Sequence, residues 1–104
     1  MIYRQGDILL VATADAAEGE PLPRDPVRGV VLAVGESTNH FHRFTDEHVE
    51  LRDPRTRATR HLTVVKTEAR LLHEEHAPIT ITPGHYDLPQ QMEYRPTELR
   101  RVAD

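Results

Sequence analysis

The stretch Gly6–Ala12, GDILLVA, is a short and continuous apolar run. Runs of this length that are rich in Val, Ile and Leu are typical of buried β-strands. Gly29–Val34 (GVVLAV) and His61–Val65 (HLTVV) predict two more strands of the same kind. Pro78–Thr82 (PITIT) alternates strictly between apolar and polar residues, which indicates a strand with one solvated face.

Weaker strand signals lie around Val49 and Leu51, at Ala69–His73 and at Tyr86–Tyr94, whereas no window keeps a helical period over three turns. Eight prolines and five glycines punctuate the chain, many of them between these candidate strands. We therefore predict an all-β fold, a small barrel or sandwich of about seven or eight short strands. The length of 104 residues suits a single domain over residues 1–104.

Composition excludes several classes of protein. The chain has no cysteine, which excludes disulfides, Cys-ligated zinc and a Cys nucleophile. Its net charge of −4 argues against a protein that coats nucleic acid. We expect no membrane association and a cytoplasmic location, because no apolar run of membrane-spanning length and no signal pattern occur. Ser37 is the single serine and no GxSxG surrounds it, which argues against a serine triad.

Two loops stand out. Thr13–Arg28 is long and carries three prolines, so it is either a lid or binding loop or a plain insertion. Arg52–Arg60 (RDPRTRATR) carries four arginines and has the pattern of a hairpin tip. It could hold a phosphate or an acidic partner, or be a solvated turn.

The chain has seven histidines, more than its three tyrosines and two phenylalanines together. The strongest local signal is Gly35–His42, GESTNHFH. His40 and His42 on one strand would project from the same face and could chelate one metal ion. Imidazole suits Zn, Fe, Ni and Cu. The alternative is a chance pair of surface histidines.

Further candidate ligands lie at predicted strand ends. Glu47 follows His42 closely enough to return across a tight turn, and Glu75 and His76 precede a strand boundary. Two or three histidines with one carboxylate, gathered at a barrel mouth, are the usual layout of a catalytic non-haem metal site. On a strand His73 and His76 would face opposite sides, so we favour His76 as the ligand and place His73 at the surface.

Three other positions are less decided. His85 is either a ligand or a turn residue, and His48 and His61 are interpreted as structural or solvent-facing. Glu93 could be a partner of the site or its general base, or could belong to an outward-facing polar row.

The segment Gly35–Glu47 resembles the first motif of the cupins: a glycine, a spacer, His-x-His, a short spacer and then Glu. The resemblance implies a cupin-like metal-binding β-barrel in which His40, His42 and Glu47 are ligands. A third histidine would come from a later motif, and this match does not decide between His76 and His85.

The whole chain is also similar to an uncharacterised family of short bacterial and phage proteins. The shared pattern consists of QGD, GExTxHxH, EH and QxEY. Here these motifs are Gln5-Gly6-Asp7, Gly35–His42, Glu75-His76 and Gln91–Tyr94. This similarity brings no activity with it, but it favours His76 over His85.

We therefore expect a small metal-dependent enzyme of hydrolase or oxygenase type, with a mononuclear site for a divalent transition metal (Zn, Fe, Ni or Mn). His40, His42, His76 and Glu47 would be ligands, and Glu75 and Glu93 candidate catalytic groups. The arginines of Arg52–Arg60 suggest a small anionic or phosphorylated substrate. The alternative is a non-catalytic interaction module with a structural metal or none. A homodimer is plausible in either case.

Overall fold

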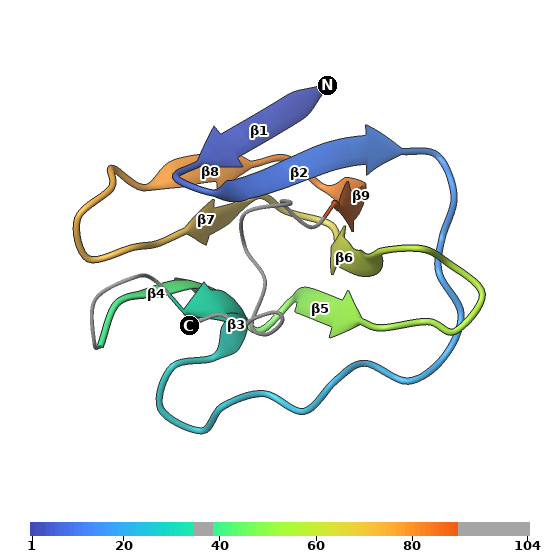
Figure 1. The fold of residues 1–104 in the computed structure, drawn as a ribbon, viewed down its shortest axis with the longest axis horizontal. Coiled ribbons are helices and arrows are strands. Elements are labelled where there is room, and N and C mark those ends of the chain that lie inside the picture. The colour runs from blue at the N-terminus through green and yellow to red at the C-terminus, as the bar shows by residue number, and fades with distance from the viewer. Residues whose placement is uncertain (35–38, 90–104) are drawn as a thin grey trace, which may run out of the picture.

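The computed structural model describes residues 1–34 and 39–89, and all regular structure within them is β-strand (Figure 1). This confirms the predicted all-β fold class. The described residues form nine strands, slightly more than predicted. None of them forms a helix long and apolar enough to cross a membrane. The strands are β1 (Ile2–Gln5), β2 (Ile8–Thr13), β3 (Val30–Val34), β4 (Phe41–Phe44), β5 (Val49–Arg52), β6 (Arg60–Val64), β7 (Ala69–Leu71), β8 (Ile79–Ile81) and β9 (Gly84–Leu88).

The strands pair in antiparallel fashion throughout. Five of them form a sheet in the order β1-β2-β9-β6-β5, and the others form the pairs β3-β4 and β7-β8. Backbone hydrogen bonds of 3.0 and 2.8 Å between Arg43 and Leu72 connect β4 to the end of β7. In addition, β3 packs against β5. A 3.1 Å hydrogen bond between the hydroxyl groups of Tyr3 and Thr82 connects β1 to the residue that follows β8.

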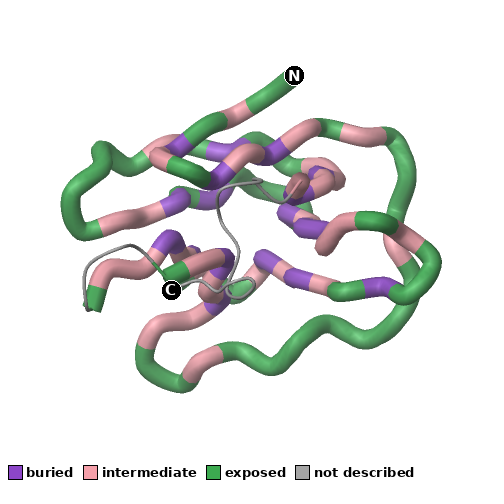
Figure 2. Tube along the Cα trace, viewed as in Figure 1, coloured by how far each residue is buried: buried purple, intermediate pink, exposed green. Residues whose placement is uncertain are grey.

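Alternation along the strands builds the core. In β2 the buried side chains are Ile8 and Leu10, and in β9 they are Tyr86 and Leu88. The other strands contribute residues of the same kind, and Figure 2 shows the buried positions on the strands. Burying such a side chain contributes about 1.5–3 kcal/mol. The remaining core residues are Val30, Leu32, Phe44, Val49, Leu51, Leu62, Val64, Ala69, Leu71 and Ile81.

The first predicted strand begins two residues later than the apolar run does. Gly6 and Asp7 form a turn between β1 and β2, and β2 starts at Ile8. Gly6 has a φ of 56°, a left-handed conformation that glycine adopts without steric cost. Gln5, the last residue of β1, directly precedes this turn.

The long segment 14–28 runs along β5, which is an edge strand. The Leu22 amide donates to the Leu51 carbonyl at 2.7 Å, and the Arg24 guanidinium donates to the carbonyls of Val49 and Thr45 at 3.3 Å each. The segment, which we call the strap, is largely exposed itself (Figure 2). It occupies hydrogen-bonding groups of an edge that would otherwise be open to another chain.

The arginine-rich segment is a hairpin tip between β5 and β6, as predicted. Three of its four arginines bind partners within the protein. Arg52 donates to the Gly19 carbonyl at 2.8 Å and pairs with Glu50 at 2.9 Å, Arg57 pairs with Asp87 at 2.8 Å, and Arg60 donates to the Leu32 carbonyl at 2.8 Å. The contacts of Arg52 and Arg57 tie the hairpin to the strap and to β9, so an anion bound at either of them would have to displace these contacts.

Candidate functional site

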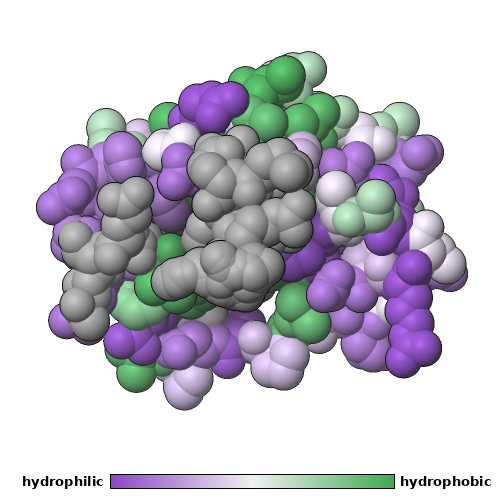
Figure 3. Space-filling view, in the orientation of Figure 1, coloured by the Kyte–Doolittle hydropathy of each residue, from purple (hydrophilic) through white to green (hydrophobic). Residues whose placement is uncertain are grey.

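Four histidines gather where the β1–β2 turn, the start of β4 and the β7–β8 connection meet, at the left of Figure 1. His42 lies 4.3 Å from His73 and 5.8 Å from His76, measured between ring centroids. His73 lies 4.7 Å from His76 and 5.5 Å from His40. We call these four residues the histidine cluster. The side chains around the β1–β2 turn and the β7–β8 connection are mostly hydrophilic (Figure 3).

The buried member of the cluster is His42, which is 5% exposed. Its Nδ1 lies 2.9 Å from Oε1 of Gln5, which is also buried. The amide nitrogen of Gln5 donates to the carbonyls of Leu71 at 2.9 Å and Ala77 at 3.0 Å. Because both amide protons are used, Oε1 must accept, and Nδ1 of His42 must carry the proton. The Nε2 lone pair of neutral His42 is therefore left available.

The surroundings of His42 keep it neutral. The pKa of His42 is lowered from 6.5 to about 4, chiefly by burial and then by the neighbouring His73 and His76, and Asp7 and Glu74 offset this only in part. At neutral pH the ring is therefore an uncharged imidazole. This is the form that binds metals or accepts hydrogen bonds.

His73 has a different role in this arrangement. Its Nδ1 accepts hydrogen bonds from the backbone amides of Glu75 at 3.0 Å and His76 at 3.4 Å. A neutral ring that accepts at Nδ1 carries its proton at Nε2, so both nitrogens of His73 are committed. Burial first, and then the neighbouring His76, lowers the pKa of His73. The residue shapes the turn after β7 more than it offers a lone pair.

The more accessible members of the cluster are His40 and His76. The side chain of His40 is 21% exposed, and its Nε2 lies 3.9 Å from a carboxylate oxygen of Glu75. His76 is exposed. Glu74 accepts a 2.8 Å hydrogen bond from the Phe41 amide, which lowers the pKa of its carboxyl group and ties the turn to the start of β4.

Gly6 makes room for the cluster. A Cβ atom at this position would lie 2.8 Å from Nε2 of His76 and 3.2 Å from Cε1 of His42. The sequence pattern Gln5-Gly6-Asp7 thus has one residue that orients His42, one that permits the close approach and one whose charge acts on His42. Neither hydropathy nor spacing marks Gln5 and Gly6 as site residues, and the sequence signal that includes both is the shared QGD motif.

The expectation that His73 and His76 face opposite sides is wrong. An extended strand would separate the two rings, but residues 74–76 form a bend after β7, which brings both rings to the same side. Glu47 lies in the turn after β4, at the other end of that strand from His40, and is exposed. The structure does not bring it into the cluster. Glu93 lies outside the described residues.

His61 and His85 form a separate group. His85 was expected to be either a ligand or a turn residue. His85 on β9 lies 3.2 Å from His61 on β6, between Nδ1 and Nε2. His61 was expected to be either structural or solvent-facing, and because it has no exposed surface only the structural alternative holds for it. His85 therefore lies apart from the His40 and His42 pair.

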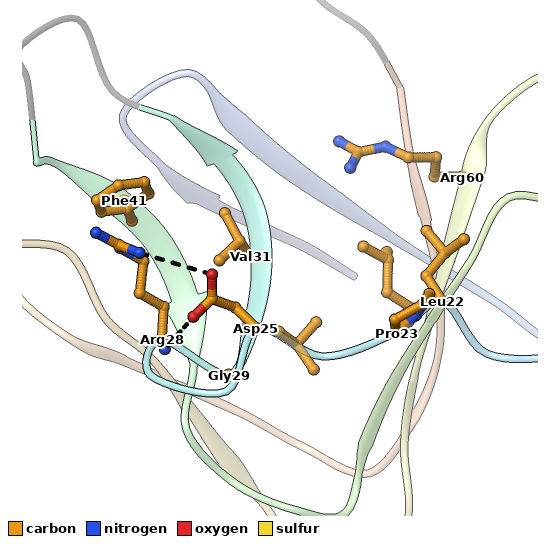
Figure 4. Close-up of a pocket in the computed structure, with 10 residues that line it drawn as sticks. Leu22, Pro23, Asp25, Arg28, Gly29, Val31, Phe41 and Arg60 are labelled. Carbon is orange, nitrogen blue, oxygen red and sulfur yellow. Dashed lines mark hydrogen bonds and ion pairs between the residues drawn. The ribbon is translucent and has the colours of Figure 1, made fainter.

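A groove on the other face of β4 is lined by residues of the strap, β3, β5 and β6. Figure 4 shows Arg28 between Asp25 and the ring of Phe41, whose centroid lies 4.2 Å from the guanidinium carbon. Side chains of successive residues point to opposite faces of a strand, so Phe41 and His42 serve different sides of β4. The groove is separate from the histidine cluster.

In their present conformations, the side chains of the histidine cluster do not form a complete set of metal ligands. Within residues 1–34 and 39–89, no three His, Asp or Glu side chains are arranged to hold a metal ion together. Binding through His40, His42 and His76 would need a rotation of the two accessible rings. Such rotations are ordinary for partly exposed side chains.

The chain belongs to the family described as a domain of unknown function (DUF8820), which matches residues 4–91. The match includes Gln5-Gly6-Asp7 and all four residues of the histidine cluster. Searches of curated proteins and of solved structures found no match.

Proposed function

We propose that this member of the family binds a divalent transition metal through His40, His42 and His76 and uses it for hydrolase- or oxygenase-type chemistry. One observation carries the proposal: Gln5 holds His42 by Nδ1, so that Nε2 is unprotonated within a group of imidazoles. A histidine ligand usually donates its second ring N–H to an oxygen acceptor, which fixes its orientation and tautomer. Gln5 is such an acceptor.

The burial of this polar group supports the proposal. A buried His42 and a buried Gln5 are costly unless their polar atoms are satisfied, and a core of this size has apolar alternatives. The Gln5 amide and Nδ1 of His42 are satisfied by each other and by two carbonyls. A bound cation would give Nε2 of His42 its partner as well.

The accessibility of the other two histidines favours a catalytic site over a closed one. His40 and His76 lie where water can reach them, so a metal held by three imidazoles would keep a position for water or substrate. Glu75, with a carboxylate oxygen 3.9 Å from Nε2 of His40, would accept or donate a proton there. The resemblance of Gly35–Glu47 to the first cupin motif is consistent with this chemistry.

The charges around the cluster bear on the substrate. Asp7, Glu74 and Glu75 lie next to the imidazoles, whereas the arginine-rich hairpin tip lies at the other end of the molecule (Figure 1). A small neutral or cationic substrate therefore suits this end better than the anionic one that the arginines suggested.

The alternative is a structural metal in a non-catalytic module. It would require a fourth protein ligand to close the coordination sphere. The nearest imidazole is His73, which would first have to release the amides of Glu75 and His76. The number of protein ligands therefore separates the two functions.

The test is metal binding by untagged protein, measured as metal content by mass spectrometry and by titration with Co²⁺, whose visible spectrum reports the ligand number. We expect about one ion per chain, with three nitrogen ligands and solvent. His40→Ala and His76→Ala should each weaken binding by more than the roughly 10–100-fold that loss of an outer partner costs.

The matched control is His48→Ala. His48 is a partly buried histidine outside the cluster, bonded to the Glu68 carbonyl at 3.0 Å, so its loss should leave metal binding unchanged. Four nitrogen ligands without solvent would support the structural module instead. Equal binding by wild type and by the double variant H40A/H76A, or no binding by either after reloading, would refute a metal at this cluster.

A further inference from the structure

A hydrogen-bonded chain of four side chains runs across β9, β6 and the arginine-rich hairpin tip. Nη2 of Arg57 donates to Oδ1 of Asp87 at 2.8 Å, and the same oxygen lies 3.4 Å from Nδ1 of His61. Nε2 of His61 lies 3.2 Å from Nδ1 of His85. These four side chains include no member of the histidine cluster.

Strand register places these groups together. His61 is the cross-strand partner of Asp87, and Thr63 is the partner of His85. The alternate residues of the same strands, such as Leu62 and Tyr86, belong to the core. The four hydrogen-bonded side chains therefore lie on the face of the five-stranded sheet that points away from the core.

The ring nitrogen that carries the proton in each histidine can be assigned by starting from Asp87. The hydrogen bonds from Arg57 and His61 outweigh the effect of burial and lower the pKa of Asp87, which is therefore an acceptor. His61 is buried, which lowers its pKa despite Asp87, so it is a neutral ring that donates from Nδ1 and accepts at Nε2.

His85 must then donate to His61. Its Nδ1 carries the proton, and Thr63 Oγ1 lies 3.1 Å from the same nitrogen. The lone pair of neutral His85 is therefore on Nε2. His85 is partly exposed, whereas His61 has no exposed surface.

We propose that His85 is the proton-accepting group of a second, metal-independent site on this face, acting on small molecules that carry an ester or similar acyl group. In the reaction the O–H proton of an attacking water moves to Nε2 of His85 while the oxygen bonds to the acyl carbon. The imidazolium formed is stabilised through His61 by Asp87. The bond between the acyl carbon and the leaving oxygen then breaks, and the imidazolium proton passes to that oxygen, which releases an acid and an alcohol and restores neutral His85. The carboxylate of Asp87, which is 30% exposed, acts on His85 through the buried His61, and a positioned imidazole is the group that most often carries out such proton transfers.

The first test is NMR on the wild-type protein with a chelator present, using long-range ¹H–¹⁵N correlations of the imidazole rings. At neutral pH we expect protonated Nδ1 and unprotonated Nε2 for both His61 and His85. A proton on Nε2 of neutral His85 would overturn the proposal, and this measurement needs no variant.

The second test is the hydrolysis of p-nitrophenyl acetate, again with a chelator so that the metal site cannot contribute. We expect His85→Gln to lose the hydrolysis above background and Asp87→Asn to lower it by about tenfold, the low end of what loss of an outer hydrogen-bond partner costs. His48→Gln is the matched control and should retain the wild-type rate. Circular dichroism verifies that each variant is folded.

Equal rates for wild type and His85→Gln would refute the second site. A rate that is restored in the chelator-treated His85→Gln protein by adding metal would assign the hydrolysis to the histidine cluster instead. Should Asp87→Asn fail to fold, His85→Gln and the NMR measurement still decide the proposal.

Discussion

Gln5 and His42, which are 37 residues apart in the chain, share a 2.9 Å hydrogen bond between Oε1 and Nδ1. The amide nitrogen of the same glutamine donates to two carbonyls at either side of the β7–β8 hairpin. One buried side chain therefore connects β1, β4 and the segments next to β7 and β8. It also sets the tautomer of the buried histidine.

The first prediction concerns Gln5→Leu. This change leaves the carbonyls of Leu71 and Ala77 and the N–H of His42 without their partner, and buried unsatisfied groups cost about 1–3 kcal/mol each. After partial relaxation we expect the free energy of unfolding to fall by about 2–4 kcal/mol, measured by urea denaturation.

Gln5→Glu is the companion variant. A carboxylate keeps the acceptor for Nδ1 of His42 and favours the charged imidazole, so the pKa of His42 should rise. Wild-type stability in Gln5→Leu, or an unchanged His42 titration in Gln5→Glu, would contradict the role given to this glutamine.

The second prediction concerns Gly6→Ala. The φ of 56° costs a residue with a side chain about 1–2 kcal/mol, and the new methyl group would lie 2.8 Å from Nε2 of His76. We expect lower stability and a displaced His76 ring, detected by the chemical shifts of its imidazole and by weaker metal binding.

Gly19→Ala separates the two effects. Gly19 also has a positive φ, 97°, but a Cβ there would meet nothing within 4 Å. It should lose stability through backbone strain and leave the His76 signals in place. Identical His76 shifts in Gly6→Ala and wild type would show that the close approach does not matter.

The third prediction is a pH dependence of stability in the metal-free protein. The pKa of His42 is about 4 in the folded protein, against an ordinary value of 6.5. Below pH 6.5 the unfolded chain takes up a proton that the folded protein does not, so the free energy of unfolding falls as pH falls from 6.5 towards 4. The loss from this group is at most about 3 kcal/mol.

Urea denaturation at several pH values with a chelator measures this slope. His61 and His73, whose pKa values are also lowered by burial, add to it in the same direction. His42→Gln should therefore show a shallower slope, though not a flat one. The same slope in both proteins would mean that His42 does not carry the effect.

The fourth prediction concerns the strap. Arg24→Ala removes the two hydrogen bonds from the guanidinium to the carbonyls of Val49 and Thr45. We expect a stability loss of about 1 kcal/mol and faster hydrogen exchange at the Leu22 amide, which is bonded to Leu51. Arg55→Ala, at the exposed hairpin tip, is the control and should change neither. Unchanged exchange at Leu22 in Arg24→Ala would show that the strap is held without this side chain.

Much of the fold could be predicted from local pattern. The apolar run at Gly29–Val34 contains β3 and the alternation at Pro78–Thr82 contains β8, while the run at His61–Val65 contains β6 except for its first residue, Arg60. The error at Gly6–Ala12, where a turn precedes β2, has a local cause. Hydropathy does not separate a glycine that begins a strand from one that turns the chain into it.

The candidate site was less predictable. His40, His42 and His76 were proposed together from the sequence, and the structure places their rings around His73. Glu47 was proposed for its spacing, yet lies beyond the far end of β4. Spacing along a strand sets which face a side chain shares, but not which turn folds back over it.

The sequence by itself determined the β-structure and most of the strand positions, because these depend on hydropathy period and residue type over a few neighbours. Only the tertiary structure decided that Gln5 orients His42 and that His85 joins His61 rather than His40. Those pairings arise from cross-strand register and from contacts between residues that are 24 to 72 positions apart in the sequence. Contacts over such separations depend on how the sheets pack as a whole.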